Sequence, residues 1–167
     1  VGVNGGTITM TSVTNDGNIK SIQGLAGGIL GQNRGSIFVK NATNDGQITS
    51  RTGGNANGVG GIIGNVYSNG EITVIESSNH GDLIVSGKGI YVGGIVGNVF
   101  LLNPNLSLVN VINSGTLRAN LIEDGGSPFA KAGGLIGGIS NAVNTTPIEI
   151  VNSINVGSLT GSGTLAT

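Results

Sequence analysis

The stretch SIFVKNATNDGQI, residues 36–48, contains a pattern that the chain repeats along its length. Its last five letters, NDGQI, recur as NDGNI at 15–19, NHGDL at 79–83, NSGTL at 113–117 and NVGSL at 155–159. In every copy an apolar residue stands seven positions and five positions before the Asn, and an aliphatic residue stands four positions after it. Because this spacing holds in all five copies without a gap, the chain is a repeat protein.

The apolar positions of the repeat predict strands. The first two alternate with period two, as in Ile37-x-Val39, so they share one face of a strand. The three rows are Ile8, Ile37, Ile72, Leu106 and Ile148; Met10, Val39, Val74, Leu108 and Ile150; and Ile19, Ile48, Leu83, Leu117 and Leu159. No stretch shows sustained apolar spacing of 3.6 residues, and the many glycines disfavour helices.

A second motif lies between these copies and completes the repeat. It reads LAGGILG at 25–31, GVGGIIG at 58–64, YVGGIVG at 91–97 and KAGGLIG at 131–137. Each unit therefore reads as three short strands, and stacking units about 4.8 Å apart would align their aliphatic residues. We predict an all-β fold, a parallel β-solenoid (β-helix) of about five coils. It forms a single repeat domain, residues 1–167, with coils at approximately 1–24, 25–57, 58–90, 91–130 and 131–167.

The Asn-x-Gly phrases predict corners between strands. Asn can bond the backbone two residues on, and we expect each Gly to adopt a positive φ. When the coils stack, the five Asn side chains should form an amide ladder in which each donates to the next. The predicted structural corners are Asn15, Gly17, Asn44, Gly46, Asn79, Gly81, Asn113, Gly115, Asn155 and Gly157.

The Gly-Gly-Ile-Ile-Gly segment carries two adjacent aliphatic residues, of which a strand can bury only one. We therefore expect one of two sets to point outward as an apolar stripe suited to self-association. The two sets are Ile29, Ile62, Ile95 and Leu135, or Leu30, Ile63, Val96 and Ile136.

Composition narrows the function. Glycine contributes 33 of 167 residues, charged residues 9% and aromatic residues 3%, with a net charge of −1 and no cysteine. There is no basic field for nucleic acid, no apolar run of membrane-spanning length and no thiolate metal site. Since the sequence does not begin with Met and shows no signal peptide, we expect a piece of a longer protein.

Few residues could serve in catalysis or metal binding, and no cofactor is expected. His80 with Asp45 offers too few ligands for a metal, and the NDG phrases lack the ligand density of calcium loops. A carbohydrate-active β-helix stays as the alternative if acids converge in a groove, the candidates being Asp16, Asp45, Glu71, Glu76, Asp82 and Glu149. Sequons at Asn41, Asn105 and Asn144 matter only in a eukaryotic source.

The phrases GLAGGILGQNRGSI and GVGGIIGNVYSNGEI resemble the GLUG repeat of large bacterial surface and secreted proteins. The resemblance covers most of the chain and implies an extracellular, adhesin-like stalk segment with no catalytic residues. We therefore expect a non-enzymatic structural or adhesive solenoid at the cell surface, self-associating or part of a longer stalk or filament. Its expected partners are copies of itself, flanking repeats of the same chain, or surface glycans, with no nucleic acid and no membrane insertion.

Overall fold

A computed structural model of the chain describes residues 3–4, 6–22, 24–52, 57–67, 70–100, 105–123, 131–140 and 148–165. Within these ranges the regular elements are strands, and every strand pairing is parallel. The described part of the chain contains no helix long and apolar enough to cross a membrane. The predicted parallel β-solenoid is confirmed.

The strands form four sheets, named here A to D. Sheet A contains β1 (Val3–Asn4), β5 (Leu30–Asn33), β9 (Ile63–Tyr67), β14 (Val96–Phe100) and β19 (Ile136–Ser140). Sheet B contains β2 (Ile8–Asn15), β6 (Ile37–Asn44), β10 (Glu71–Ile75), β11 (Ser78–Asn79), β15 (Asn105–Val109), β16 (Ile112–Asn113), β20 (Ile148–Val151) and β21 (Ile154–Asn155). Sheet C contains β3 (Ile19–Ser21), β7 (Ile48–Thr52), β12 (Leu83–Lys88), β17 (Leu117–Glu123) and β22 (Leu159–Leu165). Sheet D contains β4 (Ala26–Gly27), β8 (Asn57–Gly60), β13 (Ile90–Gly93) and β18 (Lys131–Gly133).

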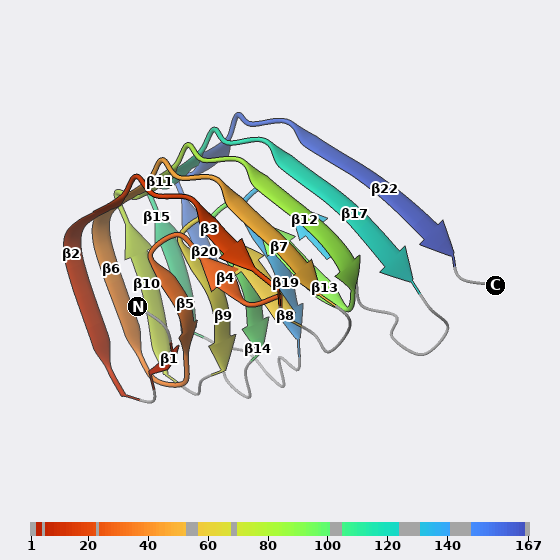
Figure 1. The fold of residues 1–167 in the computed structure, drawn as a ribbon. Coiled ribbons are helices and arrows are strands. Elements are labelled where there is room, and N and C mark those ends of the chain that lie inside the picture. Colours follow the sequence, from red (N-terminus) through yellow and green to blue (C-terminus); the bar gives the residue numbers. More distant parts are fainter. Residues whose placement is uncertain are drawn as a thin grey trace.

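Each coil visits the sheets in the order D, A, B, C, and the next coil lies on top of it. Figure 1 shows the result as rows of equivalent strands, running from red at the first coil to blue at the last. The register follows the sequence repeat: Ile72 pairs with Ile37 on one side and with Leu106 on the other. The rows of apolar residues that the sequence predicts are therefore stacked columns.

The structure divides each coil more finely than the three strands we expected. The chain bends at the residue pairs 28–29, 61–62, 94–95 and 134–135, so each Gly-Gly-Ile-Ile-Gly segment supplies one strand to sheet D and one to sheet A. In addition, the sheet B strand is interrupted in the later coils, as between β10 and β11.

A column of left-handed residues runs through sheet B. Three residues before each corner Asn, the backbone has a positive φ between 47° and 57°. This conformation departs from extended backbone, and in the later coils the residue lies at the break, as Glu76 does between β10 and β11, whereas β2 and β6 run through it. The column consists of Ser12, Asn41, Glu76, Asn110 and Asn152, and Asn is the residue other than Gly that tolerates this conformation best.

The core is divided into two parts. One cluster lies between sheets A and B and includes Leu30 and Ile63 from sheet A with Ile37 from sheet B. The other lies between sheets C and D and includes Leu83 and Val59. The cross-section is therefore layered in the order B, A, D, C, which can be followed in Figure 1.

Sheets A and D pack closely because their facing residues are glycines. A Cβ built on Gly60 would overlap the carbonyl oxygen of Ile63, and a Cβ on Gly97 would overlap the backbone of Val59. Only glycine permits two backbones to approach this closely. The Gly-Gly segment thus forms a tight bend between sheets D and A, which pack against each other between the two apolar cores.

The expected apolar stripe on the outside of the Gly-Gly-Ile-Ile-Gly segment is wrong. Both aliphatic positions are buried in the cluster between sheets A and B: Ile29 is 5% exposed, and Leu30, Ile62, Ile63, Ile95 and Val96 are fully buried. In the last coil, Leu135 and Ile136 are partly buried and pack against the same cluster. Because the first aliphatic residue sits in the bend and the second begins the next strand, strand alternation does not apply across the pair.

Candidate functional site: the coil-stacking surface

The five corner Asn residues form a continuous ladder through the stack. Asn15 Nδ2 donates to Asn44 Oδ1 at 2.7 Å, Asn44 donates to Asn79 at 2.7 Å, Asn79 to Asn113 at 2.7 Å, and Asn113 to Asn155 at 2.6 Å. Each Nδ2 also donates to the carbonyl of the Gly two residues later, at 2.8–3.2 Å. The ladder has a direction, since every side chain donates towards the C-terminal end.

Backbone hydrogen bonds at the corner run in the opposite direction. The N–H of the residue after each Asn donates to the carbonyl of the previous coil's Asn, as from His80 to Asn44 and from Ser114 to Asn79, both at 2.8 Å. Each corner therefore offers a carbonyl and a side-chain N–H to the following coil, and an N–H and a side-chain oxygen to the preceding one.

The corner glycines are required by the stacking of the coils. The positive φ that we expected at these glycines is wrong. Neither Gly46 nor Gly81 has a left-handed φ. Instead, a Cβ on Gly46 would overlap the carbonyl oxygen of Gly17, and a Cβ on Gly81 would overlap that of Gly46. Gly115 and Gly157 lie in the same way against the preceding glycine of the column.

The two sequence motifs meet at this ladder. The second glycine of each Gly-Gly pair lies directly against the side chain of the corner Asn in the same coil. A Cβ on Gly28 would overlap the side chain of Asn44, and a Cβ on Gly61 would overlap that of Asn79. Gly94 lies in the same way against Asn113. The bend between sheets D and A thus covers the inner side of the Asn ladder. Asn44, Asn79 and Asn113 have no exposed surface.

Among the described residues, the first and the last coil each have a neighbouring coil on one side only. In the last coil Ile148, Ile150 and Leu159 are 44%, 47% and 47% exposed, whereas the residues beneath them in the same columns are fully buried. In the first coil the matching residues Ile8, Met10 and Ile19 are only partly buried. The outermost strands of the sheets, including β22 and β3 of sheet C, lie in these two coils.

Only some of the polar side chains that sequence analysis considered for catalysis or metal binding lie close together. Asp45, His80 and Asp82 line one surface pocket at the corner, together with Asn18, Gln47 and Gly81. Of the six carboxylates considered for a carbohydrate-active groove, this pocket holds two. The described residues contain no group of three or more His, Asp or Glu that could hold a metal ion.

The groups in this pocket already contact neighbouring coils. His80 Nδ1 lies 2.6 Å from Ser114 Oγ, and Asp82 Oδ1 accepts a hydrogen bond from the Thr116 amide at 2.9 Å. Their observed contacts are those of coil stacking.

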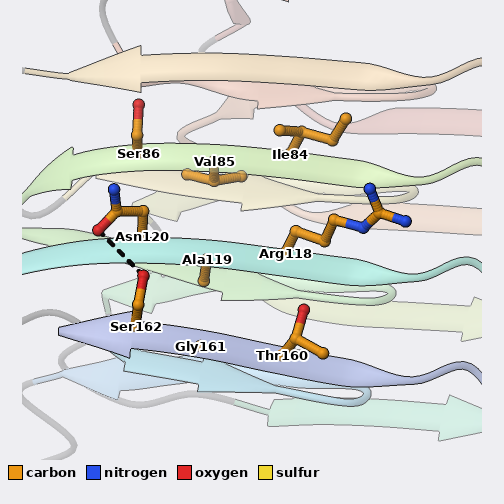
Figure 2. A pocket seen from close by; sticks show the side chains of 9 residues that line it. All are labelled: Ile84, Val85, Ser86, Arg118, Ala119, Asn120, Thr160, Gly161 and Ser162. Atoms are coloured by element: carbon orange, nitrogen blue, oxygen red, sulfur yellow. Dashed lines mark hydrogen bonds between the residues drawn. The ribbon is translucent and has the colours of Figure 1, made fainter.

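Figure 2 shows a second pocket on sheet C, lined by residues of β12, β17 and β22. In the same strands the residues of one column become smaller, from Val85 through Ala119 to Gly161. Arg118 also lines the pocket, and Ser162 Oγ donates to Asn120 Oδ1 at 3.2 Å. The shrinking column could have been read from the repeat register, but sequence analysis did not consider it.

Two further features were missed by sequence analysis. Asn65 is fully buried, and neither its Oδ1 nor its Nδ2 has a hydrogen-bond partner. The rings of Tyr67 and Phe100, on neighbouring coils, lie 5.3 Å apart and tilted by 49°. Both aromatic residues occupy the same position of the repeat, which is the signal that could have paired them.

The glycosylation candidates differ in position. Asn41 is exposed and belongs to the left-handed column, and Asn105 is exposed at the first residue of β15. Asn144 lies outside the described residues.

Comparison with protein-family models, with curated protein sequences and with solved structures finds no match for this chain. The resemblance to the GLUG repeat therefore stays a prediction from the sequence. Any functional assignment depends on the geometry of the coil stack itself.

Proposed function

We propose that this chain is a non-enzymatic structural segment of an extracellular or cell-surface protein, and that coil stacking is its function. The observation that carries the proposal is the coil interface itself, in which the Asn ladder and the buried apolar columns continue from coil to coil. A segment of this kind lengthens a stalk or filament by adding coils from flanking repeats or from other copies. Its partners are then solenoid surfaces of the same type.

The coil interface supports this role by its uniformity. The Asn ladder, the stacked glycines and the apolar columns recur in successive coils. Repeat proteins gain stability from such nearest-neighbour interfaces, so a rod can be extended without a new type of contact.

The location and the adhesive contribution rest on the GLUG resemblance and on the polar outer face of sheet C. Arg118, Asn120 and Ser162 border the pocket in Figure 2 and offer hydrogen-bonding groups to surface glycans. Adhesion is secondary to the structural role in this proposal.

An antibody raised against the chain tests the proposal on intact source cells. We expect labelling at the cell surface, and rods or filaments in negative-stain images of the released material. Labelling only after the cells are permeabilised would contradict the extracellular role, and compact particles would contradict the stalk.

The second candidate is a carbohydrate-active domain, favoured by the pairing of Asp45 and Asp82 beside His80 in one pocket. A panel of polysaccharides incubated with the chain tests it. Release of sugar ends that disappears in the Asp45→Asn/Asp82→Asn double variant would support this candidate and overturn the structural proposal.

A further inference from the structure

Alternate residues of the sheet C strands point outward and form one face of the solenoid. Leu83, Val85, Leu117 and Ala119 belong to the core between sheets C and D, so their neighbours along each strand point away from that core. Among the outward residues whose side chains the structure describes on these strands, Ile84 is apolar and the rest are polar or basic.

Four successive strands of sheet C each carry one cationic residue on this face. They are Lys20 on β3, Arg51 on β7, Lys88 on β12 and Arg118 on β17, and they are called the basic face below. Lys20, Arg51 and Arg118 are exposed, and Lys88 is half-buried. Since the chain has seven Lys and Arg residues in all, the fold gathers most of its cations on one side.

The register places three of these cations on a diagonal line across the coils. Lys20 pairs with Thr49, two residues before Arg51, and Arg51 pairs with Ser86, two residues before Lys88. Diagonal neighbours of this kind lie about 7–8 Å apart. The basic face therefore forms a track that one extended anionic chain can follow from coil to coil.

The carboxylates whose side chains the structure describes lie outside the basic face. They are Glu71, Glu76 and Glu149 on sheet B or beside it, and Asp16, Asp45 and Asp82 at the corner. Sheet B is the opposite outer layer of the cross-section, and its Lys40 lies 3.5 Å from Glu76. In contrast, no described carboxylate forms an ion pair with Lys20, Arg51 or Arg118. The charges are thus separated between faces although the net charge is only −1.

Neutral polar groups lie beside the cations. Figure 2 shows Arg118 and Thr160 in one row of side chains and Asn120 and Ser162 in a second row, both lining the pocket on sheet C. Amides and hydroxyls can bond sugar hydroxyls, and a guanidinium pairs well with a carboxylate. The described part of this face carries no aromatic ring on which nucleic acid bases could stack.

We propose that the basic face binds an acidic polysaccharide that extends over several coils. The proposal deepens the proposed function, and rests on it, by naming the class of glycan to which the solenoid adheres. Carboxylates of the glycan pair with Lys20, Arg51 and Arg118, and its hydroxyls bond to Asn120 and Ser162 beside them.

Fluorescence anisotropy of labelled polygalacturonate, titrated with the 167-residue chain, tests the proposal. We expect saturable binding that weakens as added salt screens the charges. Labelled dextran, a neutral glucan, should not bind under the same conditions.

The double variant Arg51→Gln/Arg118→Gln removes two cations from the basic face. We expect its Kd for polygalacturonate to rise about tenfold, as the loss of two exposed ion pairs predicts. Arg34→Gln/Lys40→Gln is the matched control, because it removes the same charge outside sheet C, and its Kd should change less than about twofold. Both variants should keep the melting temperature of the unchanged chain, since none of the four side chains is buried.

Three results would each overturn the proposal: no saturable binding at low salt, equal binding of dextran, or equal loss of affinity in the two double variants. Tighter binding of a single-stranded oligonucleotide than of polygalacturonate would overturn it in favour of nucleic acid. If polygalacturonate does not bind while the antibody labels intact cells, the glycan is wrong and the structural role stands. If it binds while the antibody labels only permeabilised cells, the extracellular role is wrong and the basic face keeps its ligand class.

Discussion

Replacement of Asn79 by Ala tests the energetic importance of the ladder. This side chain is fully buried and takes part in three hydrogen bonds: it donates to Gly81 O at 2.9 Å and to Asn113 Oδ1 at 2.7 Å, and it accepts from Asn44 at 2.7 Å. At about 0.5–1.5 kcal/mol for each bond, with a further penalty for polar groups left unpaired in the interior, the loss should be about 2–5 kcal/mol.

A loss of this size is a large part of the 5–15 kcal/mol by which domains are usually stable. Chemical denaturation followed by circular dichroism measures it, and hydrogen exchange shows whether the coils on both sides of Asn79 loosen first. Asn155→Ala is the control, because Asn155 lies in the last described coil, where water can replace the lost bonds, so about 1 kcal/mol is expected. Equal losses for the two variants would refute the buried ladder as a source of stability.

Three further predictions concern other parts of the coil. Ile72→Asn, in the apolar core, should lose about 3–5 kcal/mol, whereas the matched Thr73→Asn on the outer face should lose under about 0.5 kcal/mol; equal melting temperatures would show that the faces are misassigned. Gly46→Ala should lose at least about 2 kcal/mol in denaturant titrations, because its Cβ meets backbone that cannot yield, and a neutral effect would contradict the close stacking. Glu76→Asn should gain about 0.5–1 kcal/mol by relieving its φ of 49°, despite losing the 3.5 Å pair with Lys40, which is worth little at the surface; a lower melting temperature would disprove this.

The coil stack could be predicted because the repeat has a fixed spacing. Ile37-x-Val39 alternates with period two, and the same spacing before Asn44 and Asn79 allows the coils to be aligned without any structure. The separation of 35 residues between these two Asn residues is then the length of one coil.

The bend at the Gly-Gly segment could not be predicted, because the close contacts that require glycine there are made with other coils and other sheets. Local sequence rules treat Ile62 and Ile63 as neighbours on one strand, whereas the chain bends between sheets D and A at this point. The glycines permit that bend by leaving room for backbone from other segments. For the same reason, the sequence analysis explained Gly46 by a positive φ, whereas its contact with Gly17 is what requires a glycine.

The left-handed column was within reach of sequence analysis and was not recognised. Asn41, Asn110 and Asn152 each stand three residues before a corner Asn, and a recurring Asn in a strand is a signal of positive φ. Glu76 hides the pattern in its coil, because Glu gives no such signal.

The most direct test of the stacked-coil fold uses engineered cysteine pairs in this cysteine-free chain. Thr73 and Ser107 are direct partners on β10 and β15, and paired strands lie about 4.8 Å apart, which suits a disulfide. Val109 is two residues out of register with Thr73, about 8 Å away, which is too far for the same bond. The fold predicts that Thr73→Cys/Ser107→Cys oxidises readily in the folded chain and that Thr73→Cys/Val109→Cys does not. Equal oxidation of both pairs, or preference for the second, would contradict the register on which the whole coil stack depends.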